Sequence, residues 1–179
     1  LGDVYKRQVL VMHIESSERG KIFLNASLDG RDDYYDDCRP SPDDKNTLLY
    51  TGGTGSRDGI FFAAALTCFA EGGTVRTLGG ALTVSGANAA TLILSVGTSF
   101  YHGDHYEASA LLDASYAAEC SYEELLYRHL TEYQEKFRRV RFTLPDNSEG
   151  GSSLPTDERL MRLRGDCLLY TSPSPRDRG

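Results

Sequence analysis

The hydrophobic pattern of the chain changes its period near residue 100. From residue 9 to residue 99, apolar side chains recur at every second position, in short runs that end at glycine pairs or polar turns. From Tyr106 to Phe137 they recur at every third or fourth position, which is typical of helices. Short alternating runs between turn signals favour an antiparallel sandwich over a parallel α/β sheet. We therefore expect a mainly β chain, with an antiparallel β-sandwich followed by two helices.

The first part of the alternating region predicts a β-hairpin and a long loop. Residues 10–14 and 22–28 each place their apolar side chains on one face, and the polar segment 15–20 separates them as a turn would. Residues 29–46 contain seven aspartates and two prolines. We expect this second segment to be an exposed loop.

The second part predicts a meander of strands joined by glycine turns. Residues 60–70 are apolar on both faces, as expected for a central strand that is covered on both sides. Gly72-Gly73 and Gly79-Gly80 are turn signals, because glycine adopts positive φ without strain. The sheet region should contain at least six or seven strands in all. Its remaining strands are expected at residues 74–78, 81–85 and 89–99.

The helical region predicts two helices, the first from Tyr106 to Glu119. The second starts at Ser121, because Ser121 and Glu124 form the S-x-x-E pattern of a capping box. The apolar side chains of the second helix lie on one stripe, which we expect to pack against something large. This stripe consists of Tyr122, Leu125, Leu126, His129, Leu130, Tyr133 and Phe137.

The chain beyond this helix predicts a return strand, a loop and a further helix. Val140, Phe142 and Leu144 alternate within Arg138 to Leu144, as in a strand. Residues 145–153 are rich in Gly, Ser and Asp and are expected to be a loop. A helix should then begin with Thr156 as its cap and two acidic residues in its first turn.

Composition excludes two classes of function. The 179 residues carry a net charge of -7, which argues against a nucleic-acid surface, because such surfaces cluster positive charge. No apolar run approaches the roughly 18 residues of a membrane-spanning helix. Cys38, Cys68 and Cys120 are widely spaced and odd in number, so neither a zinc ribbon nor a disulfide framework is indicated. Sugars and other neutral small molecules remain as ligands.

The two ends of the chain are related to each other through the genetic code. One coding of the first residues, LGDVYKRQ, has a reverse complement that translates, one base later, into Cys167 to Pro173 and the start of Ser174. One DNA element in opposite orientations at both ends looks like a translated sequencing adapter. We therefore expect residues 1–8 and 167–179 to be foreign. Residues 9–166 are then expected to be a piece of a longer protein.

Several short motifs resemble functional sites, but each has a structural explanation that we favour. His102-Gly103-Asp104-His105 offers three metal-capable side chains, yet no further cluster completes a coordination shell, so it is interpreted as a polar connection. The acidic loop lacks the spacing and the terminal Glu of an EF-hand, which favours a solvated loop over a calcium site. Its acidic residues are Asp32, Asp33, Asp36, Asp37, Asp43 and Asp44.

The remaining motifs are equally weak. Gly52-Gly53-Thr54-Gly55-Ser56 lacks the Gly-Lys-Ser/Thr signature of a phosphate loop and is interpreted as a turn. Asn25-Ala26-Ser27 is a glycosylation sequon inside an expected strand. His129 lies on the apolar stripe, where a histidine is more often structural than catalytic. No inward-facing carboxylate pair is predicted from Glu123, Glu124 and Glu132. The residues themselves therefore predict no catalytic residue, no metal ligand and no cofactor site.

Several blocks of the chain occur in the same order and spacing in one enzyme family. The upstream blocks are D-G-I-F-F-A-A-A-L at residues 58–66, E-G-G-T-V at 71–75 and G-A-N-A-A-T-L-I-L-S-V-G-T-S-F at 86–100. Downstream come S-Y-E-E-L-L-Y-R-H-L-T-E-Y-Q-E-K-F-R-R-V-R-F-T-L at 121–144 and L-P-T-D-E-R-L at 154–160. Together they resemble glycoside hydrolase family 95, the inverting α-L-fucosidases, over about residues 9–163.

This resemblance implies a larger, multidomain enzyme. In that family an N-terminal β-supersandwich is followed by a helical linker, a catalytic (α/α)6 barrel and a C-terminal β-domain. Residues 9–103 would be a truncated β-sandwich, and residues 104–144 the helical linker with its return strand. Residues 145–166 would be the loop that leads to the catalytic barrel, which is absent. The stripe of the second helix would pack against that barrel.

The resemblance also implies a reaction. Hydrolysis with inversion needs a carboxylic acid that protonates the leaving oxygen and a base that activates water on the opposite ring face. In the family both lie in the barrel, where an Asn assisted by an Asp activates the water. We therefore expect the parent protein to release terminal α-L-fucose from fucosylated oligosaccharides or glycans. The present piece is expected to be structural, with no catalytic residue, metal or cofactor.

Two alternatives stay open. The same scaffold could act on α-L-galactosides, or the segment could be a freestanding carbohydrate-binding or interaction module. Sugar-binding sandwiches usually present exposed aromatic platforms, and Tyr34-Tyr35 is the candidate that the sequence offers. Neither a nucleic acid nor a membrane is expected as a partner. The sequence leaves the periplasm, the cell exterior and the cytoplasm open as compartments.

Overall fold

The computed structural model describes residues 8–30, 36–55, 58–142 and 154–165. The predictions for residues 1–7 and 166–179, which cover most of the expected adapter segments, lie outside these residues. The chain forms two compact units, Leu1–Tyr133 and Gln134–Gly179.

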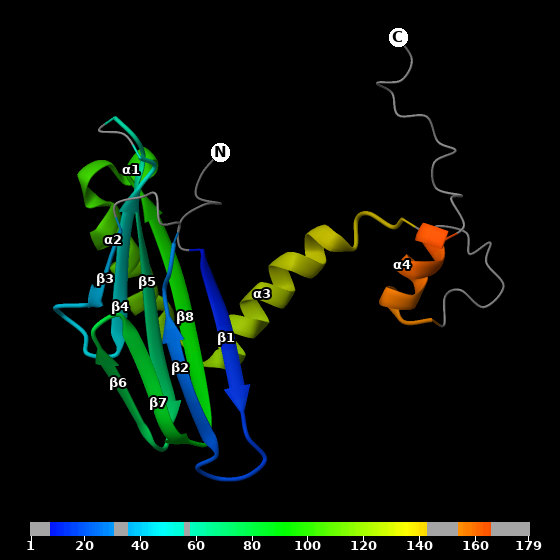
Figure 1. Ribbon diagram of the computed structural model, residues 1–179, viewed down its shortest axis with the longest axis horizontal. Helices are drawn as coiled ribbons and strands as arrows, with labels where there is room; N and C mark the ends of the chain where they lie inside the picture. Colours follow the sequence, from blue (N-terminus) through cyan, green and yellow to red (C-terminus); the bar gives the residue numbers. More distant parts are fainter. Residues whose placement is uncertain (1–7, 31–35, 56–57, 143–153, 166–179) are drawn as a thin grey trace. The chain divides into compact units, whose positions relative to one another are not determined.

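The first unit contains eight strands in two sheets (Figure 1). The five-stranded sheet has the order β1-β8-β5-β4-β3, and the three-stranded sheet has the order β2-β7-β6. Every paired strand among the described residues runs antiparallel to its neighbour, which confirms the predicted antiparallel β-sandwich. The strands are β1 (Val9–Glu15), β2 (Ile22–Ser27), β3 (Asp36–Pro40), β4 (Thr47–Gly53), β5 (Phe61–Glu71), β6 (Thr74–Leu78), β7 (Ala81–Ala87) and β8 (Ala89–Thr98).

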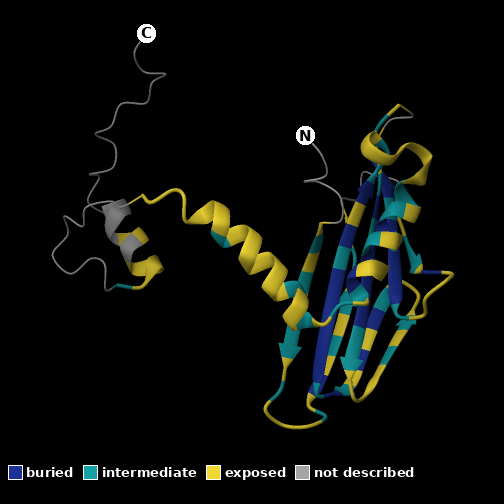
Figure 2. Ribbon diagram, turned by 180° about the vertical axis from the view of Figure 1, so that it is seen from behind, coloured by how far each residue is buried: buried dark blue, intermediate teal, exposed yellow. Residues whose placement is uncertain are grey.

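Strand β5 lies in the middle of the larger sheet and is covered on both faces, as its apolar pattern predicts. Leu66 and Cys68 point into the core between the two sheets, whereas Ala63 and Ala65 belong to a second core on the opposite face. The core between the sheets consists of Ile22, Leu48, Leu66, Cys68, Leu82, Val84, Ala87, Ala90 and Leu92. Figure 2 shows the buried residues of this region in dark blue.

The smaller sheet covers only part of the larger one. Leu10 and Met12 on β1 pair with Leu94 and Leu92 and therefore share the face that looks toward the core. Both side chains are nevertheless more than half exposed, as is Val96 on β8. An apolar part of the inner face of the larger sheet is thus left open to solvent.

Both glycine pairs are turns, but they do not produce the expected meander. Gly79-Gly80 closes a tight hairpin between β6 and β7, where Leu78 pairs with Ala81. Gly72 and Gly73 have φ values of 70° and 65°, and they carry the chain from β5 into β6 on the other sheet. A Cβ at Gly73 would lie 2.4 Å from the carbonyl oxygen of Ser85, so only glycine fits this crossing.

The predicted hairpin of the first two strands is wrong. β1 pairs with β8 and β2 pairs with β7, so the two strands lie in different sheets. Ile14 and Leu24 still share a core, because apolar faces can meet across a sandwich as well as along one sheet. The connection between the strands is fixed at Gly20, whose N–H donates to Oδ1 of Asn88 at 2.8 Å.

The predicted loop over residues 29–46 contains an edge strand. β3 pairs with β4, with Cys38 opposite Tyr50. Arg39 on β3 bonds Oδ2 of Asp37 at 2.5 Å and Oε2 of Glu107 at 3.1 Å. The ion pair with Glu107 joins this acidic segment to the helix that follows the sheets.

The helices of the first unit follow β8. They are α1 (Ser99–His102), the 3-10 turn η1 (Gly103–His105), α2 (Tyr106–Ala118) and α3 (Tyr122–Phe137), which continues into the second unit. Ser121 caps α3 as predicted, since the N–H of Glu124 donates to its Oγ at 3.2 Å. The carboxylate of Glu124 accepts a hydrogen bond from Arg128 instead of reaching back to Ser121.

Helix α2 packs closely on the outer face of the larger sheet. Its buried face consists of Ala110, Ala114 and Ala117. Beneath it lies Gly97 of β8, where a Cβ would stand 2.3 Å from the carbonyl oxygen of Tyr106. Small residues on both sides therefore allow the helix backbone to approach the strand directly.

The second unit contains α4 (Thr156–Gly165), with Asp157 and Glu158 in its first turn. The expected helix is confirmed, although Thr156 is its first residue rather than its cap. Residues 138–142 form a turn and irregular chain, so the expected return strand is absent over its described part. Leu144 and the loop at residues 145–153 lie outside the described residues.

The close approach at Gly97 yields a first prediction. Gly97→Ala should destabilise the domain by about 1 to 3 kcal/mol, because the new methyl group must push α2 away from β8. The measurement is the urea midpoint followed by far-ultraviolet circular dichroism. Gly80→Ala is the matched control, since its Cβ would meet Cys38 only at 3.5 Å, an ordinary contact. Equal midpoints for the two variants would contradict this account of the helix–sheet contact.

Candidate functional site

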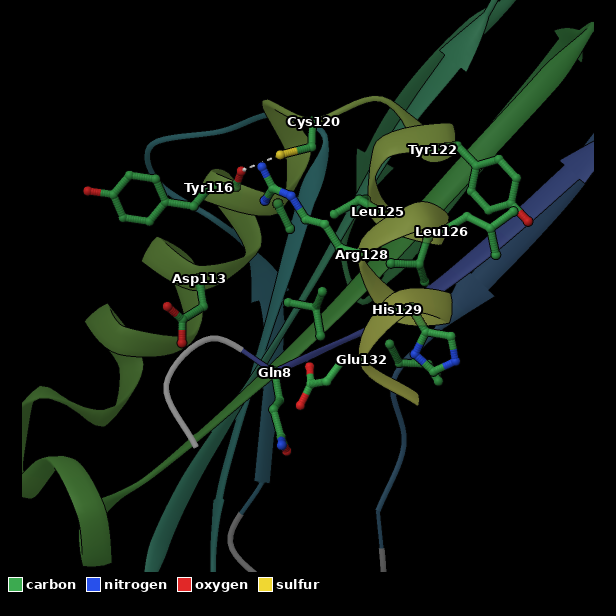
Figure 3. A pocket seen from close by; sticks show the side chains of 14 residues that line it. Gln8, Asp113, Tyr116, Cys120, Tyr122, Leu125, Leu126, Arg128, His129 and Glu132 are labelled. Carbon is green, nitrogen blue, oxygen red and sulfur yellow. Dashed lines mark hydrogen bonds between the residues drawn. The ribbon is translucent and has the colours of Figure 1, made fainter. Parts of the chain in front are cut away.

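A groove of about 710 Å³ opens on the outer side of the first unit, between β1, α2 and α3. Figure 3 shows the side chains that line it. They are Gln8, Val9, Leu10 and Val11 from the β1 segment, Asp113, Tyr116, Ala117 and Cys120 from the α2 segment, and Tyr122, Leu125, Leu126, Arg128, His129 and Glu132 from α3. This volume lies within the range of small-molecule sites.

His13 holds the start of α3 against β1 at one end of this groove. Its ring stacks on Tyr122, with ring centroids 4.1 Å apart and planes 10° from parallel. Its Nδ1 lies 2.8 Å from Oγ1 of the buried Thr91, and its Nε2 lies 2.9 Å from Oε1 of Glu15. Both ring nitrogens are hydrogen-bonded and only 11% of the side chain is exposed, so His13 is a structural contact.

The polar side chains of the groove suit binding rather than catalysis. Asp113 and Glu132 bring carboxylates from two helices. Arg128 is paired with Glu124, and the ring of His129 stacks on Tyr133 with centroids 5.6 Å apart. Carboxylate, imidazole and amide groups beside leucine and tyrosine side chains can accept or donate hydrogen bonds to a neutral polar ligand. The sequence predicts no catalytic role for His129, and its ring contact with Tyr133 is a packing contact.

The histidine motif near residue 102 is spread over α1 and η1. Nε2 of His102 lies 3.3 Å from Oγ of Ser109, while Asp104 and His105 are exposed. Within residues 8–30, 36–55, 58–142 and 154–165, no group of three His, Cys, Asp or Glu side chains is placed to hold a metal ion.

The aspartates of the acidic segment likewise make separate local contacts. Asp37 pairs with Arg39, and Asp44 caps a turn by accepting from the N–H of Asn46 at 2.9 Å and from Oγ1 of Thr47 at 2.5 Å. Asp32 and Asp33 lie outside the described residues. Asp37 and Asp44 therefore serve local structure.

The glycine-rich motif is a strand end followed by a turn. Gly52 and Gly53 belong to β4, where their missing side chains leave room for the rings of Phe62 and Phe61. Thr54 then bonds the backbone of Ile60 across the turn. The sequon residue Asn25 is an exposed member of β2, as expected. Neither motif contributes to the groove.

Burial shifts the pKa of two groups. Burial raises the pKa of the Cys68 thiol to about 11, so this cysteine stays protonated and unreactive near neutral pH. Burial, together with the neighbouring Glu107 carboxylate, raises the pKa of Tyr106. Both shifts belong to packed positions in or beside the sheet, away from the groove.

Sequence reasoning misses one exposed aromatic pair. Phe100 and Tyr101 lie side by side on α1, with ring centroids 4.9 Å apart. The signal in the sequence is a pair of adjacent aromatic residues between the strand expected at residues 89–99 and the helix expected from Tyr106, a stretch to which neither pattern assigns an element. The expected platform, Tyr34-Tyr35, lies outside the described residues.

The stack at His13 yields a second prediction. His13→Ala should speed amide hydrogen exchange at Glu124 and Leu125 by about tenfold, because it removes the ring contact that holds the start of α3 to β1, and both N–H groups are hydrogen-bonded to Ser121 there. Hydrogen exchange followed by mass spectrometry measures the change. His105→Ala, which alters an exposed histidine, should leave α3 as in the parent chain. Unchanged exchange in both variants would show that α3 is held by other contacts.

No helix in the part of the chain that the structure describes is long and apolar enough to cross a membrane. A comparison with curated proteins gives no match.

A comparison with protein families matches residues 4–103 to the family described as glycosyl hydrolase family 65, N-terminal domain. The match covers more than half of the chain and includes all eight strands. It begins within the expected adapter segment at residues 1–8 and ends at the start of η1. The expected class, an N-terminal domain of a glycoside hydrolase, is thereby confirmed. The chain belongs to the glycosyl hydrolase family 65 N-terminal domain family.

Proposed function

We propose that this chain is part of the N-terminal domain and helical linker of an inverting α-L-fucosidase of glycoside hydrolase family 95. Family membership supports the glycosidase class. The resemblance supports the finer assignment, since its blocks continue past residue 103 through α3 and into α4. In this proposal the chain is structural, and the acid and the water-activating group lie in a catalytic barrel elsewhere in the parent protein.

The apolar face of α3 is the observation that carries the proposal. α3 has no buried residue, although it contains three leucines and four aromatic side chains. Tyr122, Leu125 and Leu126 line the groove, while three apolar side chains further along the helix are 41% to 63% exposed. This exposed face consists of Leu130, Tyr133 and Phe137. An apolar helix face of this length is typical of a surface that another domain covers.

The open part of the larger sheet supports the same proposal. Leu10, Met12 and Val96 are exposed on a face whose other half is buried by the smaller sheet. Further strands beside β2 would cover these side chains. They would also extend the three-stranded sheet to the larger sheet expected in a supersandwich.

The full-length parent protein provides the third prediction. The source gene should be read on both sides of residues 9–166, and the complete protein should release fucose from an aryl α-L-fucoside. Proton NMR should detect the β-anomer first, because a single displacement inverts the anomeric carbon. The 179-residue chain alone should release none.

Three substrates separate the alternatives in this assay. Faster hydrolysis of the aryl α-L-galactoside than of the fucoside would support the same enzyme scaffold with L-galactose, not L-fucose, as its preferred sugar. Activity on an aryl α-D-glucoside alone would contradict the fucosidase assignment. A stop codon soon after Arg164 would contradict the multidomain enzyme and leave a carbohydrate-binding module as the function to test.

The α3 face provides the fourth prediction, also in the full-length protein. Tyr133→Ala should lower the free energy of unfolding by about 1.5 to 3 kcal/mol, because burial against the barrel is lost. The measurement is the thermal unfolding midpoint. Tyr127→Ala is the matched control, since Tyr127 is 71% exposed and lies on a different face of the helix. Equal midpoints would show that the barrel does not cover this face.

A further inference from the structure

Helix α1 lies at one end of the sandwich (Figure 1). It carries two neighbouring aromatic side chains that are exposed to solvent. Phe100 is 71% exposed and Tyr101 is 77% exposed. Their rings contact each other edge to face, at 90°. Such exposure of two large apolar groups is unfavourable in water, and contiguous exposed apolar surface commonly marks a binding site.

The backbone that carries these rings is held in place. The N–H of Phe61, at the start of β5, donates to Oγ of Ser99 at 2.9 Å. The N–H of Gly103 closes the other end of α1 by donating to the carbonyl oxygen of Ser99. Because β5 and β8 pair up to Phe62 and Thr98, α1 extends directly from the centre of the larger sheet. The rings are thus presented on a pre-organised support, which lowers the entropy cost of binding.

The surroundings of the two rings are polar but carry no fixed positive charge from the local chain. His102, Asp104 and His105 follow the rings directly and are exposed. The segment from Thr98 to Tyr127 contains neither Lys nor Arg. Arg39, which reaches Glu107 of this segment, is paired with Glu107 and Asp37. This combination disfavours phosphate and other anions, which need cationic partners. It suits a neutral ligand that has both apolar C–H faces and hydroxyl groups.

We propose that Phe100 and Tyr101, together with His102, Asp104 and His105, form a carbohydrate-binding surface, named the α1 surface. A pyranose ring of a neutral oligosaccharide would lie against the aromatic rings, and its hydroxyl groups would bond the imidazole and carboxylate groups. The inference rests on the proposed function only in taking a glycan as the ligand class. The α1 surface would hold an outer part of the glycan, away from the bond that the parent enzyme cleaves.

Sugar titrations of the 179-residue chain test this surface. Saturation-transfer NMR should detect saturable binding of the trisaccharide fucosyllactose, with a Kd on the order of 1 mM. Phe100→Ala and Tyr101→Ala should each raise this Kd by about tenfold, since each removes one ring contact. Tyr101→Phe keeps the ring and should retain most of the affinity. Circular dichroism spectra should be the same for all variants.

A matched control comes from the opposite layer of the sandwich. Phe23 on β2 is 70% exposed, and Phe23→Ala should leave the Kd unchanged. An equal loss of affinity in Phe23→Ala, or no saturable binding by the parent chain, would overturn the proposal. Unchanged sugar binding in Phe100→Ala with lower stability of the full-length protein would also overturn it, and would make α1 a contact between domains.

A second sugar separates this proposal from the fucosidase assignment. Binding of maltose through Tyr101 would support the α1 surface even if the full-length protein released no fucose. Fucose release by the full-length protein, without any effect of Tyr101→Ala on binding, would overturn the α1 surface alone.

Discussion

The contact of α2 with the larger sheet is the constraint on which the rest of this structure depends. Gly97 and the buried alanines allow the helix backbone to lie directly on β8, and Ala63 and Ala65 complete the surface beneath it. This contact covers the second face of β5, so the central strand is buried on both sides. It also fixes the direction in which the chain leaves the sandwich, and hence the place where α3 begins. The groove between β1, α2 and α3 exists because α2 approaches so closely that α3 can reach the edge strand.

The sequence predicts where the strands of the sandwich lie better than it predicts which strands pair with each other. Residues 60–70 are recognisable as a central strand because both faces are apolar, and Gly72-Gly73 and Gly79-Gly80 are recognisable as turns because positive φ favours glycine. The prediction of a β1–β2 hairpin fails because alternation reports which face is apolar and not which edge is paired. Two strands with apolar faces can pair in one sheet or face each other across a core. β3 escapes prediction because its residues are acidic and end at a proline, and its strand conformation comes from pairing with β4, which no local pattern encodes.

The helix stripe is visible in the sequence, whereas the groove and the α1 surface are not. A period of 3.6 identifies the apolar side of a helix, so the stripe from Tyr122 to Phe137 follows from the spacing of its residues alone. The groove is built from elements about a hundred residues apart and depends on the stack of His13 on Tyr122, which no local pattern encodes. The expected strand ends at residue 99 and the expected helix begins at Tyr106, so the short helix α1 that carries Phe100 and Tyr101 falls between the two patterns.

The position of His13 gives α3 a mechanical connection to an edge strand of the larger sheet. Among the described residues, β1 pairs with β8 alone. A displacement of α3 is transmitted through the ring stack to β1 before it reaches β4 or β5, which are bonded on both sides. Edge strands open at lower free energy than central ones. A displacement of α3 would therefore be felt first as fraying of β1, while the core between the sheets stays intact.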